Sequence, residues 1–405
     1  MLLAEVLHEQ GRVLESLGLL STLTPEARHH SSDRVTALTA LAKLSLNPTA
    51  NAEHEERLQR LANIVQSGSD APTRALAGRA LAYLVGQTRN HEQTREILGL
   101  LDTIPCGELD ADSLGQLSVA RALLLYQVGD SSASFLQAIA GIDELKRRGA
   151  ANLVMVQLQG GLGSLKSREG RYEEALAHYE QALAMANRLG NDRQAANIIG
   201  NIALCCGRLG RYSEQLEWAS KVPLASGPDF GGFVEIQVAY SQAFAYAMRE
   251  RVDLVLKTSC DLDSRLVGPI PAWMRQAWSL WKADLLLLCK QRSEAIATAH
   301  AALREDSFVL HTPGFAGPFA RWISIIDESS EGSKPNSEIL SDMAARLSEY
   351  DALDQVDILC AVRMLQPVAM RGAVQSELRA KLDFLPPAIE SQLISLGMLP
   401  SERLA

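Results

Sequence analysis

Apolar residues recur along most of the chain with the three- and four-residue spacing of amphipathic helices. The clearest segment follows Gly170 and reads RYEEALAHYEQALAMANR. Its apolar face consists of Ala175, Tyr179, Ala182 and Leu183, and its glutamates, Glu173, Glu174 and Glu180, fall on the side toward water. Small residues on an apolar face let neighbouring helices approach closely. The pattern predicts an all-α protein without a sheet.

Breaks in this pattern recur at a nearly constant step. In GRYEEALAHYEQALA, from Gly170, and GRYSEQLEWASKV, from Gly210, one helix ends and the next begins. Glycine supplies the positive φ required just past a helix end, and the tyrosine is placed to pack between the paired helices. Weaker breaks lie near residues 11, 50, 90, 129, 250, 290, 332 and 372, so consecutive breaks are 39 to 42 residues apart.

This step predicts ten antiparallel helix pairs that form an α-solenoid over residues 1–385. One pair cannot bury both of its faces, so its stability comes from stacking on its neighbours. Residues 386–405 are expected to form a short helix, at Pro387–Leu396, and a tail.

Residues 153–222 resemble tetratricopeptide repeats (TPR). The residues that carry the resemblance are Leu162, Gly163, Gly170, Tyr172, Ala175, Tyr179 and Ala182. The next unit keeps Gly210 and Tyr212 but departs from the pattern at Ala203, Gln215 and Val222. The usual repeat is about 34 residues long. The longer step is similar to repeats in kinesin light chains, spindle-orientation adaptors and the sensor arms of bacterial regulators. The resemblance implies a right-handed superhelix whose concave groove binds a protein or a peptide.

In this family the first helix of each pair lines the groove, which implies a set of candidate contacts. An asparagine amide can donate to and accept from an extended peptide backbone, and arginine pairs with carboxylates. The alternative for Arg168 and Arg208 is that they end solvated helices, where a cation suits the helix dipole. The predicted groove residues are Gln157, Ser164, Arg168, Asn197, Asn201 and Arg208.

Composition narrows the class of protein further. The 405 residues are 47% hydrophobic and 21% charged, which is enough to bury a large core and argues against disorder. A net charge of −9 argues against direct nucleic-acid binding and against binding to acidic membranes. The chain has no apolar run of about 18 residues, its start lacks a secretory signal, and its six cysteines are scattered. We therefore expect a cytoplasmic protein.

Other side chains offer weaker signals. Four tryptophans, Trp273, Trp278, Trp281 and Trp322, are either exposed interface anchors or fillers between helix pairs, and we favour the second interpretation. The run QGGLGSLKS is no phosphate-binding loop, because Lys166 does not follow a glycine. Its glycines, Gly160, Gly161 and Gly163, are expected to permit close helix approach. No spacing suggests a catalytic set, a metal site or a cofactor site.

Three functions follow in order of preference. The first is a non-enzymatic scaffold whose groove binds a protein or peptide. The second is a ligand-sensing regulatory arm of a larger signalling protein or transcription regulator, because helical sequence begins at Leu2 without a polar capping helix. The third is an enzyme with its active site inside a helical toroid. The choice between a peptide and a folded partner stays open, and Leu2, Leu3 and Val6 are candidates for self-association.

Overall fold

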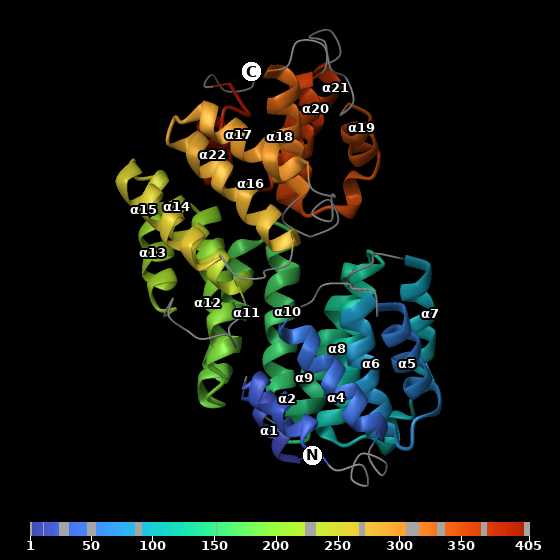
Figure 1. The fold of residues 1–405 in the computed structure, drawn as a ribbon. Coiled ribbons are helices and arrows are strands. Elements are labelled where there is room, and N and C mark those ends of the chain that lie inside the picture. The colour runs from blue at the N-terminus through green and yellow to red at the C-terminus, as the bar shows by residue number, and fades with distance from the viewer. Residues whose placement is uncertain are drawn as a thin grey trace. The chain divides into compact units, whose positions relative to one another are not determined.

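In the computed structural model every described residue is in a helix, a turn or a connection, and no strand occurs among them (Figure 1). The structure describes residues 2–10, 12–23, 32–46, 54–85, 91–150, 152–222, 232–266, 272–304, 316–329, 337–365 and 371–400. Within these ranges no helix is long and apolar enough to cross a membrane. The all-α prediction is confirmed.

The described helices form ten consecutive pairs. They are α1 (Leu2–Glu9) with α2 (Val13–Ser21), α4 (Ser32–Leu46) with α5 (His54–Ser67), α6 (Ala71–Val85) with α7 (His91–Asp102), α8 (Ala111–Gln127) with α9 (Ser131–Arg147), α10 (Leu153–Arg168) with α11 (Tyr172–Arg188), α12 (Asp192–Arg208) with α13 (Tyr212–Ser220), α14 (Gly232–Ala247) with α15 (Val252–Arg265), α16 (Ala272–Leu288) with α17 (Arg292–Leu303), α18 (Ala316–Ser329) with α19 (Ser337–Ala345), and α20 (Ala352–Leu365) with α21 (Arg371–Leu382). A last helix, α22 (Pro387–Ser395), follows, and η1 (Cys106–Glu108) and η3 (Leu347–Glu349) are short 3₁₀ turns. The predicted number of pairs is therefore confirmed.

Three of the predicted breaks, near residues 50, 90 and 332, fall outside the described residues, and so does Gly11 of the first break. The predicted break at Gly372 is wrong in position, because Gly372 already lies inside α21 and α20 ends at Leu365.

The pairs turn by the same backbone device. Gly170, Gly210, Glu250 and Lys290 all have positive φ, between 59° and 80°. In each turn the next residue donates its N–H to the carbonyl five residues before it, at 2.8–2.9 Å. This is the pattern of a Schellman cap, which satisfies the carbonyls at a helix end. The expected positive φ at Gly170 and Gly210 is confirmed, and two residues with side chains adopt the same conformation despite a cost of about 1–2 kcal/mol each.

The side-chain pattern of the best repeat is also confirmed. Ala175, Tyr179, Ala182 and Leu183 are buried, and Glu173, Glu174 and Glu180 are exposed. The tyrosine of the motif, Tyr172, is buried as expected.

Close helix approach through glycine occurs at one position of the QGGLG run. A Cβ atom on Gly163 would lie 2.7 Å from ring atoms of Tyr179 on the paired helix, so only glycine fits there. The prediction is wrong for Gly160 and Gly161, where a Cβ atom would meet nothing within 4 Å. A side chain at either position would therefore project into open space.

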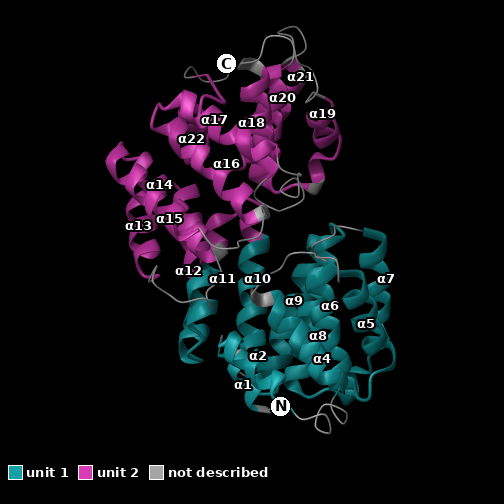
Figure 2. Cartoon of the chain, viewed as in Figure 1, with its two compact units in different colours: residues 1–165, 177–198, 225–231 teal, residues 166–176, 199–224, 232–405 magenta. Residues whose placement is uncertain are grey.

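The chain divides into two compact units (Figure 2). Unit 1 comprises residues 1–165, 177–198 and 225–231, and unit 2 comprises residues 166–176, 199–224 and 232–405. The division falls within α10, α11 and α12. The expected organisation, one solenoid over residues 1–385 and a C-terminal segment over residues 386–405, stays a prediction.

In unit 1 a continuous apolar core runs from α4 to α8. Its fully buried members include Leu61, Leu81, Leu101 and Leu124. A second cluster links α8 and α9 to α10, with Leu145 at its centre. These clusters fix the orientation of the first helices. They thereby also fix the directions in which the side chains on the other faces of these helices project.

Unit 2 is held together by helix stacking and by a buried charged cluster. Arg321 on α18 donates to Asp284 on α16 at 2.5 Å and to Asp357 on α20 at 2.7 Å. Burial would lower the pKa of the Arg321 guanidinium, but the two carboxylates outweigh this effect and raise the pKa. Asp284 also accepts the indole N–H of Trp322 at 2.8 Å. Polar side chains from three successive first helices thus fix their register.

Three of the tryptophans are core residues. Trp278, Trp281 and Trp322 are buried, which confirms the interpretation that they fill the space between helix pairs. Trp281 stacks on Tyr240 with ring centroids 4.4 Å apart. The side chain of Trp273 lies outside the described residues.

The C-terminal helix of unit 2 packs against the helix ends of the TPR motif. Leu385 would clash with any side chain on Gly170, and Ala388 with one on Gly210. Gln392 on α22 donates to the carbonyl of Gly207 at 2.8 Å. The short helix predicted after Pro386 is therefore confirmed, and it belongs to the core of this unit.

Candidate functional site

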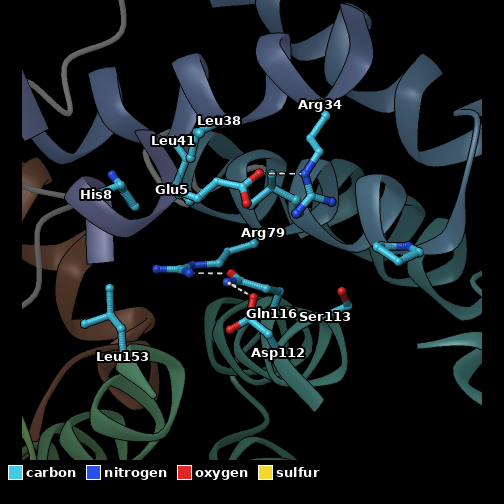
Figure 3. Close-up of a pocket in the computed structure, with 12 residues that line it drawn as sticks. Glu5, His8, Arg34, Leu38, Leu41, Arg79, Asp112, Ser113, Gln116 and Leu153 are labelled. Carbon is cyan, nitrogen blue, oxygen red and sulfur yellow. Dashed lines mark hydrogen bonds and ion pairs between the residues drawn. The ribbon is translucent and has the colours of Figure 1, made fainter. Parts of the chain in front are cut away.

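A small polar cavity lies in unit 1 between α1 and the first helices of successive pairs (Figure 3). We call the surface that α4, α6, α8 and α10 present to α1 the first-helix face. The cavity is lined by Glu5, His8, Arg34, Leu38, Leu41, Pro72, Leu76, Arg79, Asp112, Ser113, Gln116 and Leu153. Its volume of about 40 Å³ has room for a few water molecules.

Helix α1 forms one wall of this cavity. Ala4 and Leu7 are buried, whereas Leu3 and Val6 are 60% and 40% exposed. The hydroxyl of Ser16, on α2, donates to the carbonyl of Ala4 at 2.7 Å and holds the two helices together. Because α1 is amphipathic, it packs against the first-helix face through its buried side and exposes the other side to solvent.

One ion pair links α1 to the first helix below it. The Nε atom of Arg34 lies 2.6 Å from a carboxylate oxygen of Glu5. The hydrogen bond that Arg34 donates to Glu5 raises the pKa of Arg34, so the guanidinium stays charged. Both side chains keep partial contact with solvent, and such a pair contributes about 0–1 kcal/mol.

A second polar cluster lies on the floor of the cavity. Arg79, on α6, is 2% exposed and donates to the amide oxygen of Gln116 on α8. Gln116 donates to Asp112 at 3.3 Å, and Asn152 donates to the other oxygen of Asp112 at 2.9 Å. Burial raises the pKa of Asp112. The Nε atom of Arg79 has no hydrogen-bond partner, so this cation is incompletely satisfied.

His8 reaches into the same region from α1. It is 7% exposed, and its Nδ1 atom has no hydrogen-bond partner. Burial, together with the positive charges of Arg79 and Arg193, lowers the pKa of His8 from 6.5 to about 3. The docked α1 therefore carries a neutral imidazole at neutral pH.

Acid is expected to release α1 from the first-helix face. Undocked His8 regains a pKa near 6.5, so below that value the undocked helix binds a proton that the docked helix does not. Docking therefore weakens as pH falls from about 6.5 toward about 3. At pH 5 the ratio of undocked to docked α1 should be about 30-fold higher than at pH 7.5, a change of about 2 kcal/mol. Hydrogen-exchange protection of the α1 amides, corrected for intrinsic rates, measures this ratio.

The matched control is His8→Gln, which keeps a polar side chain but cannot take up the proton. Its α1 protection should be nearly independent of pH between 5 and 7.5. An equal loss of protection in the variant would assign the effect to other groups near α1, such as Glu5 and Asp112.

The groove residues predicted on α10 and α12 have varied surroundings. In unit 1 the hydroxyl of Ser164 lies 3.1 Å from that of Tyr179 and donates to the carbonyl of Gly160 at 3.2 Å. The side-chain oxygen of Gln157 is buried without a hydrogen-bond partner, and Asn197 is half-buried.

The other three predicted residues lie in unit 2. Arg168 forms an ion pair with Asp351, and Asn201 accepts a hydrogen bond from Gln237 at 2.7 Å. Arg208 is half-buried. Arg168 and Asn201 are thus engaged by neighbouring helices, and the role of all three in a groove stays a prediction.

The polar cavity of unit 1 was not predicted from the sequence. One signal was present: Arg79 interrupts the run APTRALAGRALAYLV, in which a lone charge among small apolar residues indicates a buried cation. No group of three His, Cys, Asp or Glu residues within the described ranges could hold a metal ion.

Ten consecutive pairs of described helices, four of them joined by equivalent turns at Gly170, Gly210, Glu250 and Lys290, define an α-helical repeat protein. The family model described as tetratricopeptide repeat matches residues 154–220, so this segment of the chain carries TPR repeats.

Two solved structures share its fold. The apo form of the quorum sensor NprR from B. thuringiensis is 12% identical, with a TM-score of 0.53 over 88% of this chain and 99% of that chain. NprR in complex with its cognate peptide NprX is 12% identical, with a TM-score of 0.54 over 86% of this chain and 98% of that chain. Comparison with curated proteins gave no match.

Proposed function

We propose that this chain is a non-enzymatic, peptide-binding sensor whose ligand binds on the first-helix face. The observation that carries the proposal is the cavity of unit 1, in which polar side chains from α4, α6 and α8 converge beside Glu5 and His8 of α1. A cytoplasmic regulatory role, either as a scaffold or as the sensing arm of a larger protein, agrees with this architecture.

The chemistry of this face suits a peptide. Side-chain amides such as those of Gln116 and Asn152 pair with backbone N–H and C=O groups, and arginine pairs with carboxylates. Apolar side chains between them, including Leu38 and Leu41, can receive an apolar residue. The NprR structure with its cognate peptide is a TPR-type relative in fold, and it supports peptide recognition as the general class.

The residues predicted on the neighbouring first helices extend the proposed surface. In unit 1 we assign Gln157, whose buried oxygen has no partner, and Asn197 to contacts with the peptide backbone. Ser164 is less suited, because its hydroxyl is already held by Tyr179. In unit 2 we propose ligand contacts for Arg168, Asn201 and Arg208. To make them, Arg168 would give up its ion pair with Asp351, and Asn201 its hydrogen bond with Gln237.

Selection from a random decapeptide library with free termini tests this function. A selected peptide is expected to bind the double variant Gln157→Ala with Asn197→Ala at least 10-fold more weakly than the wild-type chain. The control is Glu180→Ala, on the exposed side of a second helix, which should bind equally well. Failure to select any peptide, or equal affinity for all three proteins, would contradict the proposal.

A further inference from the structure

Helix α1 depends on the rest of unit 1 for its structure. It has eight residues, whereas isolated helices shorter than about 12–15 residues are marginal in water. Its helical state is therefore coupled to its docking on the first-helix face. Ala4 is the one described residue of α1 in the apolar core that extends from α4 to α8, so undocking of α1 exposes only the edge of that core.

Two buried apolar side chains, one ion pair and the hydrogen bond from Ser16 of α2 to the carbonyl of Ala4 retain α1. Ala4 and Leu7 bury small apolar surfaces, and the Glu5–Arg34 pair is partly exposed to solvent. A helix of eight residues that buries only two of its described apolar side chains is held less firmly than helices such as α6, which buries twelve residues.

While α1 is docked, buried polar groups in this region also lack hydrogen-bond partners. Arg79 has a buried Nε–H without an acceptor, and no carboxylate forms an ion pair with its guanidinium in the described part of the chain. His8, the residue of α1 nearest to this cation, places an unpaired Nδ1 atom in the same region. A buried polar group without a partner destabilises the docked state, because it has lost its hydrogen bonds to water. A ligand that brought an acceptor to Arg79 would remove this destabilisation.

We propose that α1 is an internal occupant of the first-helix face, and that the ligand is an acidic peptide that displaces it. A carboxylate of the peptide replaces Glu5 at Arg34. A second acceptor on the peptide receives a hydrogen bond from the Nε–H of Arg79. The inference rests on the proposed function, since it specifies the ligand of that face. The cations Arg34 and Arg79 project toward the cavity from neighbouring first helices, as Figure 3 shows.

The test uses residues 2–9 as a probe, in the form of a fluorescent LLAEVLHE peptide with blocked ends. In the wild-type chain the tethered helix competes at an effective concentration in the millimolar range and excludes the probe. In Leu7→Lys the tethered helix is displaced, because Leu7 is buried and a lysine there would be a buried charge without a partner. The probe should bind this variant at least 10-fold more tightly than it binds the wild-type chain. Val6→Lys adds the same charge on the exposed side of α1 and should behave like the wild type.

The acidic character of the ligand is tested by a probe in which glutamine replaces the first glutamate, the counterpart of Glu5. This probe should bind Leu7→Lys about 5-fold more weakly than the acidic probe. The difference should vanish when Arg34→Gln is added to Leu7→Lys. Equal binding of the two probes to Leu7→Lys would overturn the assignment of an acidic ligand.

Other outcomes separate this inference from the proposed function. Circular dichroism first establishes that Leu7→Lys is folded, and Glu5→Lys serves as the displacing variant if it is not. No probe binding to a folded displacing variant, or equal binding to it and to the wild-type chain, would overturn the inference. A library peptide that binds the wild-type chain without loss of α1 hydrogen-exchange protection would overturn it too, while the proposed function stands. The absence of any library peptide for either protein would overturn the proposed function itself.

Discussion

Replacing Arg321 with leucine is expected to lower the free energy of unfolding by about 3–5 kcal/mol. Arg321 is 5% exposed and is bonded to the buried carboxylates of Asp284 and Asp357. Without the guanidinium, two buried carboxylates face each other with no cation between them. Chemical denaturation, followed by circular dichroism and by the fluorescence of buried Trp322, measures the loss.

A triple variant separates the charge effect from lost packing. Asp284→Asn and Asp357→Asn, added to Arg321→Leu, remove both uncompensated charges and should recover most of the stability. A single variant that loses less than about 1 kcal/mol, or a triple variant no more stable than the single one, would contradict this account.

The second large effect is expected at Gly163, where leucine should cost about 2–3 kcal/mol. A Cβ atom at this position would lie 2.7 Å from the ring of Tyr179, and the remaining side-chain atoms would add to the clash. The paired helices α10 and α11 would have to separate. Thermal and chemical unfolding both report the change.

Gly161→Leu is the matched control, because the same substitution two residues earlier on α10 meets no atom within 4 Å. It should leave the stability unchanged or raise it by up to about 1 kcal/mol, since glycine is a poor helix former. Combining Gly163→Leu with Tyr179→Ala should restore part of the loss. Equal destabilisation by the two leucine variants would show that the contact with Tyr179 is not the cause.

The architecture was predictable because it is local and periodic. Each helix pair follows from an apolar spacing and a break, and both recur at a step of about 40 residues. The exact position of a break is less predictable, because a glycine does not always end a helix: Gly372 lies within α21. Conversely, Glu250 and Lys290 form the same turn as Gly170 without any glycine.

The candidate site was less predictable because it depends on contacts between distant segments. Glu5 and Arg34 belong to different pairs, and the partner of Arg79 is 37 residues away on α8. The residues predicted from the family pattern occupy the expected first helices, but that pattern does not specify their partners. Arg168 meets Asp351, 183 residues later, and no local signal indicates such an encounter.

The common turn has an evolutionary consequence. Main-chain hydrogen bonds close it at Gly170, Gly210, Glu250 and Lys290 alike, so a duplicated pair can lose its glycine and still reverse direction. Selection is then free to alter the side chains of each copy for its own task. Homology detection based on residue identity will find only the copies that have diverged least, and comparison of backbones will find the others.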